Sequence, residues 1–96
     1  MTNDACVLKL YISRRTAEIT RSIDLIEQIC ADELCGECSF EVINVREHPE
    51  LAEKMRIIAT PTLVKELPPP LRRVIGDLSD RSKILVGLDF GARQQA

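Results

Sequence analysis

The feature that most constrains the fold is a strand, a helix and a second strand in close succession near the start of the chain. Residues 6–12, CVLKLYI, would place their even-numbered side chains on one face and their odd-numbered side chains on the other, and they are rich in β-favouring types. This pattern predicts a strand. Across residues 19–30, apolar side chains recur at spacings of four, three and four. This pattern predicts an amphipathic helix that begins after Thr16 as its N-cap and ends near Leu34. A second strand over residues 40–45 would then be parallel to the first, through a right-handed crossover.

The next part of the chain predicts a short helix followed by a hairpin. Pro49 suits the first turn of a helix, where its missing N–H needs no partner. One face of this helix is expected to carry Leu51, Ala52, Met55 and Ile58. A strand should start at or just after Pro61, and the three prolines at 68–70 lead into a second strand over residues 71–75. With a last helix, the order becomes βαβ-α-ββ-α, which is that of the thioredoxin fold.

The last segment, residues 83–90 (KILVGLDF), fits two conformations. A helix over residues 80–90, capped by residues 77–79, would place Ile84, Leu85 and Leu88 on one face. A strand would instead alternate Ile84, Val86, Leu88 and Phe90 against their neighbours. Gly87 costs a helix about 1 kcal/mol relative to alanine. Asp89 near the helix end opposes the dipole by about 0.3–1 kcal/mol. We therefore expect this segment to be divided between helix and strand.

The composition excludes several classes of function. The formal net charge of −2 and the pI of about 5.4 leave no basic field to recruit nucleic acid. No apolar run approaches the roughly 20 residues of a membrane span, and the first residues lack the pattern of a signal peptide. We expect one domain over residues 1–96, in the cytoplasm, where the reducing environment disfavours stable disulfides. No cofactor is expected.

A Cys-x-x-Cys motif, Cys35 to Cys38, suggests thiol redox chemistry. Thioredoxin-like enzymes place such a pair where the first strand turns into the first helix, because the helix N-terminus lowers the thiol pKa. Here that junction is residues 13–16, Ser-Arg-Arg-Thr, and the motif lies at the other end of the helix. Incidental cysteines are the favoured interpretation, and an oxidoreductase or redox sensor that uses Cys35 and Cys38 is the alternative.

The cysteine spacing also permits a metal site, because Cys30, Cys35 and Cys38 have the separation of plant-type iron–sulfur ligands. The fourth ligand would have to be Cys6. However, Cys6 and Cys30 fall on the apolar faces of the first strand and helix, which makes them core residues. His48 is the only histidine and sits in a turn beside a proline, with no nucleophile to serve. We expect neither a metal site nor a catalytic residue.

Two further features each have a binding interpretation and a structural one. Pro61, in ATPT, stands where thioredoxin-like folds carry a cis proline, either as part of a substrate-binding edge or, the favoured interpretation, as a turn that the fold needs. Basic side chains gather on the first helix, the second helix and the hairpin, and acidic ones gather near residues 32–41. This polarity is either an ordinary solvated surface or a docking surface in which charge sets orientation.

Residues 59–80, ATPTLVKELPPPLRRVIGDLSD, resemble the KaiB family of bacterial clock proteins, and the resemblance extends over residues 6–90. It implies a non-enzymatic binding protein. KaiB proteins dock on the N-terminal ATPase ring of KaiC, displace a thioredoxin-like sensor-kinase domain and help to sequester KaiA, in clocks or clock-derived stress-response systems. A detached sensor domain of a histidine kinase is less favoured, because no kinase region follows in the chain.

The resemblance also implies an α/β fold with a thioredoxin-like βαβ N-terminal half and a metamorphic C-terminal half. The ground state of the family, usually a tetramer, has the order βαββααβ, and a rare monomer has the thioredoxin-like order βαβαββα and binds KaiC. Gly87 and Asp89 give the switch a physical basis here, since two packings that differ by a few kcal/mol can both be populated. We expect the free protein to favour the ground state, and Gly87→Ala with Asp89→Arg to favour the other.

Five basic residues match basic positions of the family and are the predicted partner contacts: Arg21, Arg56, Lys65, Arg72 and Arg73. Glu41 stands where the family carries a lysine on the edge associated with KaiA, and Cys35 and Cys38 have no counterpart in the family pattern. The acidic C-terminal tail of cyanobacterial forms is also missing from this sequence. KaiA is therefore the less supported partner, and a KaiC-like ATPase the better supported one.

Overall fold

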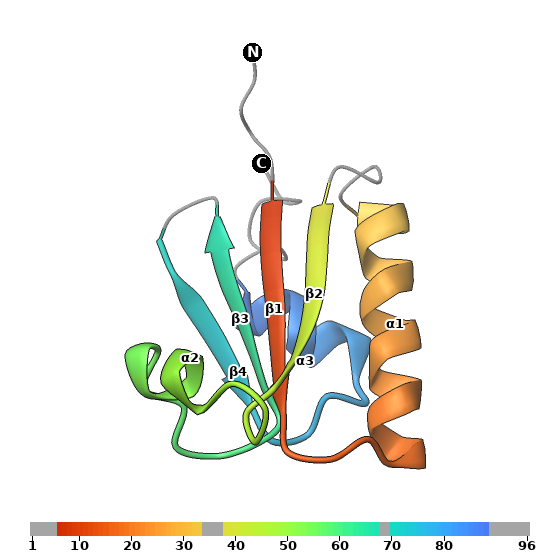
Figure 1. The fold of residues 1–96 in the computed structure, drawn as a ribbon. Coiled ribbons are helices and arrows are strands. Elements are labelled where there is room, and N and C mark those ends of the chain that lie inside the picture. Colours follow the sequence, from red (N-terminus) through yellow and green to blue (C-terminus); the bar gives the residue numbers. More distant parts are fainter. Residues whose placement is uncertain (1–5, 34–37, 68–69, 89–96) are drawn as a thin grey trace.

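The computed structural model describes residues 6–33, 38–67 and 70–88 (Figure 1). Its strands are β1 (Cys6–Ile12), β2 (Cys38–Asn44), β3 (Thr62–Leu67) and β4 (Arg72–Ile75). Its helices are α1 (Ala17–Glu33), α2 (Pro49–Lys54) and α3 (Arg81–Gly87). The order β1-α1-β2-α2-β3-β4-α3 confirms the predicted thioredoxin-like arrangement.

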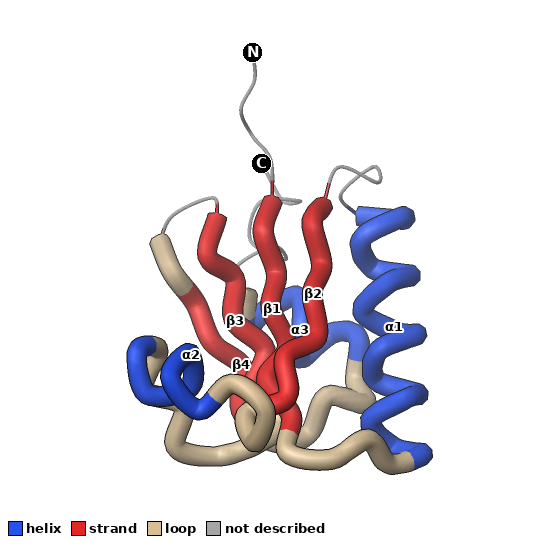
Figure 2. Tube along the Cα trace, in the orientation of Figure 1, coloured by secondary structure: helices blue, strands red, loops and turns tan. Residues whose placement is uncertain are grey.

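The four strands form one sheet in the order β2-β1-β3-β4, as Figure 2 shows. The β1–β2 pair is parallel, which confirms the predicted βαβ unit, and its register places Cys6 opposite Cys38. Strand β3 runs antiparallel to β1, and β4 pairs with β3 as the predicted antiparallel hairpin. Strand β4 is therefore an edge strand.

The helices cover the two faces of the sheet. Figure 1 shows α2 in front of the sheet and α3 behind it. The main core lies between the sheet and α1 with α3, and it includes Cys6 and Cys30, as predicted. A smaller core on the other face packs three strand residues against α2: Tyr11, Ile43 and Val64. The two faces thus have separate apolar cores.

Helix α1 begins as the sequence predicts. The Thr16 hydroxyl accepts a hydrogen bond from the Ile19 N–H at 3.1 Å, which satisfies one of the N–H groups that a helix start leaves without partners. Glu18 lies in the first turn, where its charge favours the helix dipole. Side chains at the predicted apolar positions, such as Ile23 and Ile26, are buried against the sheet.

Helix α2 is shorter than expected, and the placement of Ile58 on its buried face is wrong. The helix ends at Lys54, and Arg56 adopts a positive φ of 55° that turns the chain away from the helical path. As a result Ile58 is 89% exposed. Ile57 packs on the small core in its place.

The last described segment is a helix, capped differently from the prediction. Asp80, rather than residues 77–79, is the N-cap, and its carboxylate accepts from the N–H groups of Ser82 and Lys83. Ile84 and Leu88 are buried while Val86 is 70% exposed, which is the helical pattern and not the strand pattern. Phe90, at the predicted helix end, lies outside the described residues.

No helix in the described part of the chain has the length and apolar character needed to span a bilayer.

Candidate functional site

The turn from β1 into α1 lies beside a cis peptide bond between Thr60 and Pro61. The Thr60 hydroxyl donates to the Ser13 hydroxyl at 3.1 Å, and the Pro61 carbonyl accepts from the Gly76 N–H at 3.0 Å. These bonds connect the β1–α1 turn, the start of β3 and the end of β4. Residues 13–16 contain hydroxyl and guanidinium groups and no thiol. The arrangement resembles a binding edge without the thioredoxin nucleophile.

A groove of about 830 Å³ opens next to this edge, between the first half of α1 and the segment after β4. Ile19 and Leu25 supply apolar surface, Arg21 supplies a positive charge, and Asp77 lies on the other side. The Ser79 hydroxyl and N–H both donate to the Asp77 carboxylate, and these hydrogen bonds hold its pKa below the usual value. Asp77 is therefore ionised at neutral pH, and the groove presents charges of both signs around an apolar surface.

The five predicted partner contacts do not form one patch. Arg21, Arg56 and Arg72 are exposed, Arg73 is half-buried, and Lys65 is only 2% exposed. Lys65 and Arg72 are paired across the hairpin, so their side chains share the α1–α3 face of the sheet. Arg73 belongs to the opposite face, where Arg56 follows α2. In this conformation Arg21, Arg56 and Arg72 are the members of this set that are exposed to solvent.

The Arg73 side chain makes hydrogen bonds to the backbone of another segment of the same chain. Its guanidinium donates to the carbonyl oxygens of Met55 and Arg56, which lie at the end of α2. A cation at this position satisfies carbonyl groups that a helix end leaves without partners, and it favours the helix dipole. The sequence gives no local signal for this contact, because the donor and its acceptors are 17 and 18 residues apart.

Of the two residues predicted to govern the fold switch, Gly87 lies within the described residues and the other does not. Gly87 is the last residue of α3 and lies against Val74 on β4. Asp89 lies outside the described residues. Gly87 thus contributes to the contact between the last helix and the edge strand, a role that helix propensity alone does not indicate.

The cysteines are placed at the end of the sheet opposite the groove. Cys38 begins β2, and its thiol is hydrogen-bonded to the thiols of Cys30 and Cys6. Cys35, the other member of the predicted redox pair, lies outside the described residues. Among the residues that the structure describes, no group of three or more histidine, cysteine or acidic side chains is arranged to hold a metal ion.

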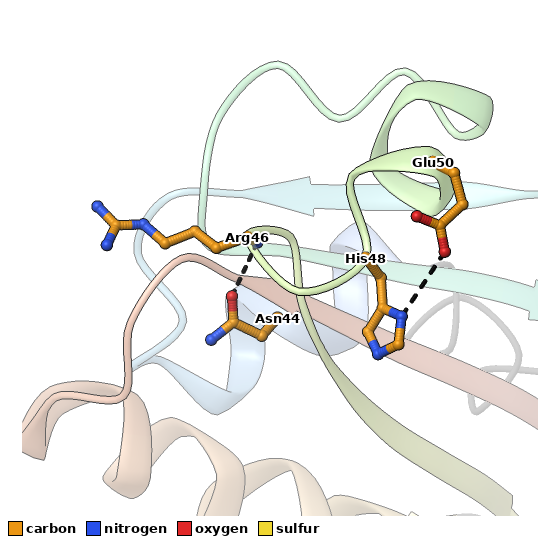
Figure 3. A network of polar contacts seen from close by, with 4 residues as sticks. All are labelled: Asn44, Arg46, His48 and Glu50. Atoms are coloured by element: carbon orange, nitrogen blue, oxygen red, sulfur yellow. Dashed lines mark hydrogen bonds and ion pairs between the residues drawn. The ribbon is translucent and has the colours of Figure 1, made fainter.

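His48 precedes α2 in an exposed turn (Figure 3). Its Nδ1 lies 3.7 Å from the Glu50 carboxylate, and no hydrogen bond from its side chain caps the helix. The Asn44 side chain accepts from the Arg46 N–H at 2.8 Å and closes the same turn. His48 therefore lies in a solvated turn, as expected from the sequence.

Comparison with protein families matches residues 9–90 to the KaiB domain. The circadian clock oscillator protein KaiB of Rippkaea orientalis is 51% identical over 84 residues, which cover 88% of this chain and 81% of that protein. The circadian clock oscillator protein KaiB1 of Synechocystis sp. is 49% identical, with 88% and 80% covered. Both matches cover at least four-fifths of each protein.

Solved structures show a thioredoxin-like fold. The N-terminal domain of SasA from Synechococcus elongatus superposes with a TM-score of 0.68 at 25% identity, covering 100% of this chain and 91% of that domain. Chloroplastic thioredoxin z superposes with a TM-score of 0.70 at 22% identity, covering 97% of this chain and 81% of the other. The second likeness concerns the fold alone.

Proposed function

The chain belongs to the KaiB family, and we propose that it is a non-enzymatic, fold-switching regulator that binds a KaiC-type ATPase ring. The observation that carries this proposal is the family match over residues 9–90, which runs from β1 past the end of α3. The β1–α1 turn supports it, because residues 13–16 place no thiol beside Pro61. In this proposal the thioredoxin-like fold serves to bind a partner protein and not to carry out thiol chemistry.

The edge strand β4 and its surroundings are the proposed docking surface. Leu71, which precedes this strand, and Ile75, which ends it, are about half exposed. The backbone of an edge strand also has groups that no neighbouring strand pairs. Arg72 lies between Leu71 and Ile75 in the sequence, and its side chain is exposed on the other face of the sheet. Apolar surface rimmed by charge is the usual composition of a protein interface. The positive rim suits an acidic surface on the ATPase and would set orientation and association rate.

The described conformation is the proposed binding-competent state. In it α3 is a helix and β4 is free at the sheet edge, which matches the thioredoxin-like order that the family uses to bind. A homo-oligomeric resting state, with the second half repacked, would hold most of the free protein. Because only the competent fraction binds, the apparent affinity falls by that fraction. KaiA is a less supported partner, and the cytoplasm is the proposed compartment.

The test is association with the KaiC-type ATPase of the same source, with and without ATP, measured by size-exclusion chromatography and native mass. We expect a complex with the wild-type chain and a loss of affinity of about tenfold or more for Arg72→Glu, which reverses a rim charge. Arg46→Glu is the matched control, because Arg46 is exposed in the β2–α2 turn, away from β4. Absence of any complex, or equal loss in both variants, would contradict the proposal.

A further inference from the structure

Three thiols lie near one another at the end of the sheet opposite the groove. Cys6 begins β1 and Cys38 begins β2, and the parallel register sets them side by side. Cys30 lies in the last turn of α1, which crosses this face of the sheet. The Cys38 thiol is hydrogen-bonded to both of the others. Cys6 and Cys30 are buried, and Cys38 is half-buried.

We propose that Cys30 and Cys38 are a redox-sensitive pair, which hydrogen peroxide converts to a disulfide between the end of α1 and the start of β2. The proposal is independent of the partner-binding function. It also differs from the pairing that the Cys-x-x-Cys motif suggests, because Cys38 packs against the core cluster that contains Cys30 of the helix.

Geometry favours Cys30 over Cys6 as the partner of Cys38. Side chains opposite one another in a parallel pair point the same way, so their Cβ atoms stay roughly as far apart as the strands, about 4.7–4.9 Å. A disulfide needs a Cβ separation of about 3.5–4.5 Å. Cys30 approaches from the helix layer above the sheet, so the spacing between strands does not fix its Cβ separation from Cys38. Cys38 is the first residue of its strand, where such adjustment is least restrained by the ladder.

The hydrogen bond also assigns the roles of the two thiols. Cys30, whose pKa the Cys38 thiol lowers against the effect of burial, is the proposed attacking thiol, and Cys38, whose pKa is raised, is the proposed resolving thiol. The Cys30 thiolate would attack one peroxide oxygen, so that an S–O bond forms, the O–O bond breaks and hydroxide leaves. Cys38 sulfur then attacks the Cys30 sulfenic acid, and the S–O bond breaks as the S–S bond forms. The departing hydroxide takes the Cys38 proton. Two thiols lose two electrons, and the peroxide ends as two waters.

The sequence permits a direct test, because a protease that cuts after glutamate puts every cysteine in a different peptide. The cuts at Glu18, Glu27, Glu33, Glu37 and Glu41 place Cys6, Cys30, Cys35 and Cys38 in residues 1–18, 28–33, 34–37 and 38–41. The full chain is treated with hydrogen peroxide, its remaining thiols are alkylated, and the linked peptides are identified by mass. We expect residues 28–33 linked to 38–41, and release of this link by dithiothreitol.

Variants distinguish the three possible disulfide partners of Cys38. Cys35→Ser should keep the link, whereas Cys30→Ser and Cys38→Ser should lose it. Circular dichroism checks that each variant folds, and the wild-type peptide map decides the question even if one does not. A link from 34–37 to 38–41, a link from 1–18 to 38–41, or four thiols that remain alkylatable would each overturn the proposal. Oxidised wild-type protein should also unfold at a higher urea concentration than reduced protein, since the cross-link constrains the unfolded chain.

Discussion

Gly87 packs so closely on Val74 that a Cβ at Gly87 would lie 2.5 Å from the Val74 Cγ2 methyl group. Valine has two heavy atoms on its Cβ, so its χ1 angle resists the rotation that would relieve such a contact. The absence of a side chain at Gly87 is therefore what allows α3 to lie against β4. Helix propensity and packing act in opposite directions at this residue.

The first prediction is that the effect of Gly87→Ala depends on the side chain at Val74. Alanine favours the helix by about 1 kcal/mol, but overpacking against Val74 costs about 1–3 kcal/mol. We expect Gly87→Ala alone to give the thioredoxin-like fold little or no gain, and Gly87→Ala with Val74→Ala to be more stable than the sum of the single changes. Urea unfolding of the four proteins in this cycle measures the coupling.

The same contact bears on the proposed fold switch. Gly87→Ala with Asp89→Arg is expected to raise the share of thioredoxin-like monomer, and adding Val74→Ala should raise it further. Size-exclusion chromatography reports the oligomer size of each variant. Single changes at Gly87 and Val74 that simply add, within about 0.5 kcal/mol, would show that the two residues do not interact.

The second prediction concerns the contact between Arg73 and the end of α2. Arg73→Ala should destabilise the fold by about 1–2 kcal/mol, because it removes charge-assisted hydrogen bonds from two carbonyl groups. Arg73→Lys should recover only part of this loss, since an ammonium group cannot reproduce the planar fork of the guanidinium. Urea unfolding gives the stability, and amide exchange shows whether the loss appears first in α2.

Arg72→Ala is the control for this series, because the neighbouring side chain is exposed on the other face of the hairpin. A surface change of this kind usually alters stability by less than about 0.5 kcal/mol. Equal losses in Arg72→Ala and Arg73→Ala would mean that the contact with α2 contributes nothing specific.

The third prediction concerns the start of α3. Asp80→Ala should weaken this helix by about 1 kcal/mol, because the Asp80 carboxylate accepts from the N–H groups of Ser82 and Lys83. Asp80→Asn should retain most of the stability, since asparagine is an equally good N-cap. If the second half has an alternative packing, Asp80→Ala should also reduce the thioredoxin-like share, as monitored by native mass. Asp24→Ala, at an exposed position in α1, is the matched control, and the same loss there would contradict the capping role.

Local patterns in the sequence predict most of the elements, and contacts between distant segments decide the rest. The Thr16 cap and the burial of Ile84 follow from residues within one or two helical turns, so the sequence indicates them directly. The positive φ of Arg56 does not, and that single turn exposes Ile58. For this reason the helix predicted from the apolar periodicity runs past the observed end of α2.

The candidate site was less predictable than the fold, because its side chains act across elements. The sequence identifies Arg73 as basic, but only the pairing of β4 with β3 brings it to the end of α2. The Cys-x-x-Cys spacing directs attention to Cys35, whereas the register of β1 with β2 and the position of α1 bring Cys6 and Cys30 to Cys38. Such contacts depend on strand register and helix packing, which no short motif encodes.

The fourth prediction uses Tyr11, which is the only tyrosine in a chain that has no tryptophan. Its side chain is 1% exposed in the small core beneath α2. Burial raises the pKa of its phenol above the usual value of about 10 for tyrosine, and the Glu66 carboxylate adds to this effect. The folded chain therefore holds this proton more tightly than the unfolded chain, so the contribution to stability is complete below about pH 10 and is lost as pH rises through the folded-state pKa.

Absorbance of tyrosinate at alkaline pH should accordingly show a midpoint above 10 for the folded protein and a lower one in urea. Lysines titrate in the same range, so the stability of the wild type is compared with that of Tyr11→Phe, which keeps the ring and removes the proton. We expect the alkaline loss of stability to be smaller in Tyr11→Phe. Equal losses in the two proteins, or a tyrosine midpoint near 10 in the folded state, would contradict the assignment. Because Tyr11 lies between the sheet and α2, the same absorbance change would report when this side of the molecule opens.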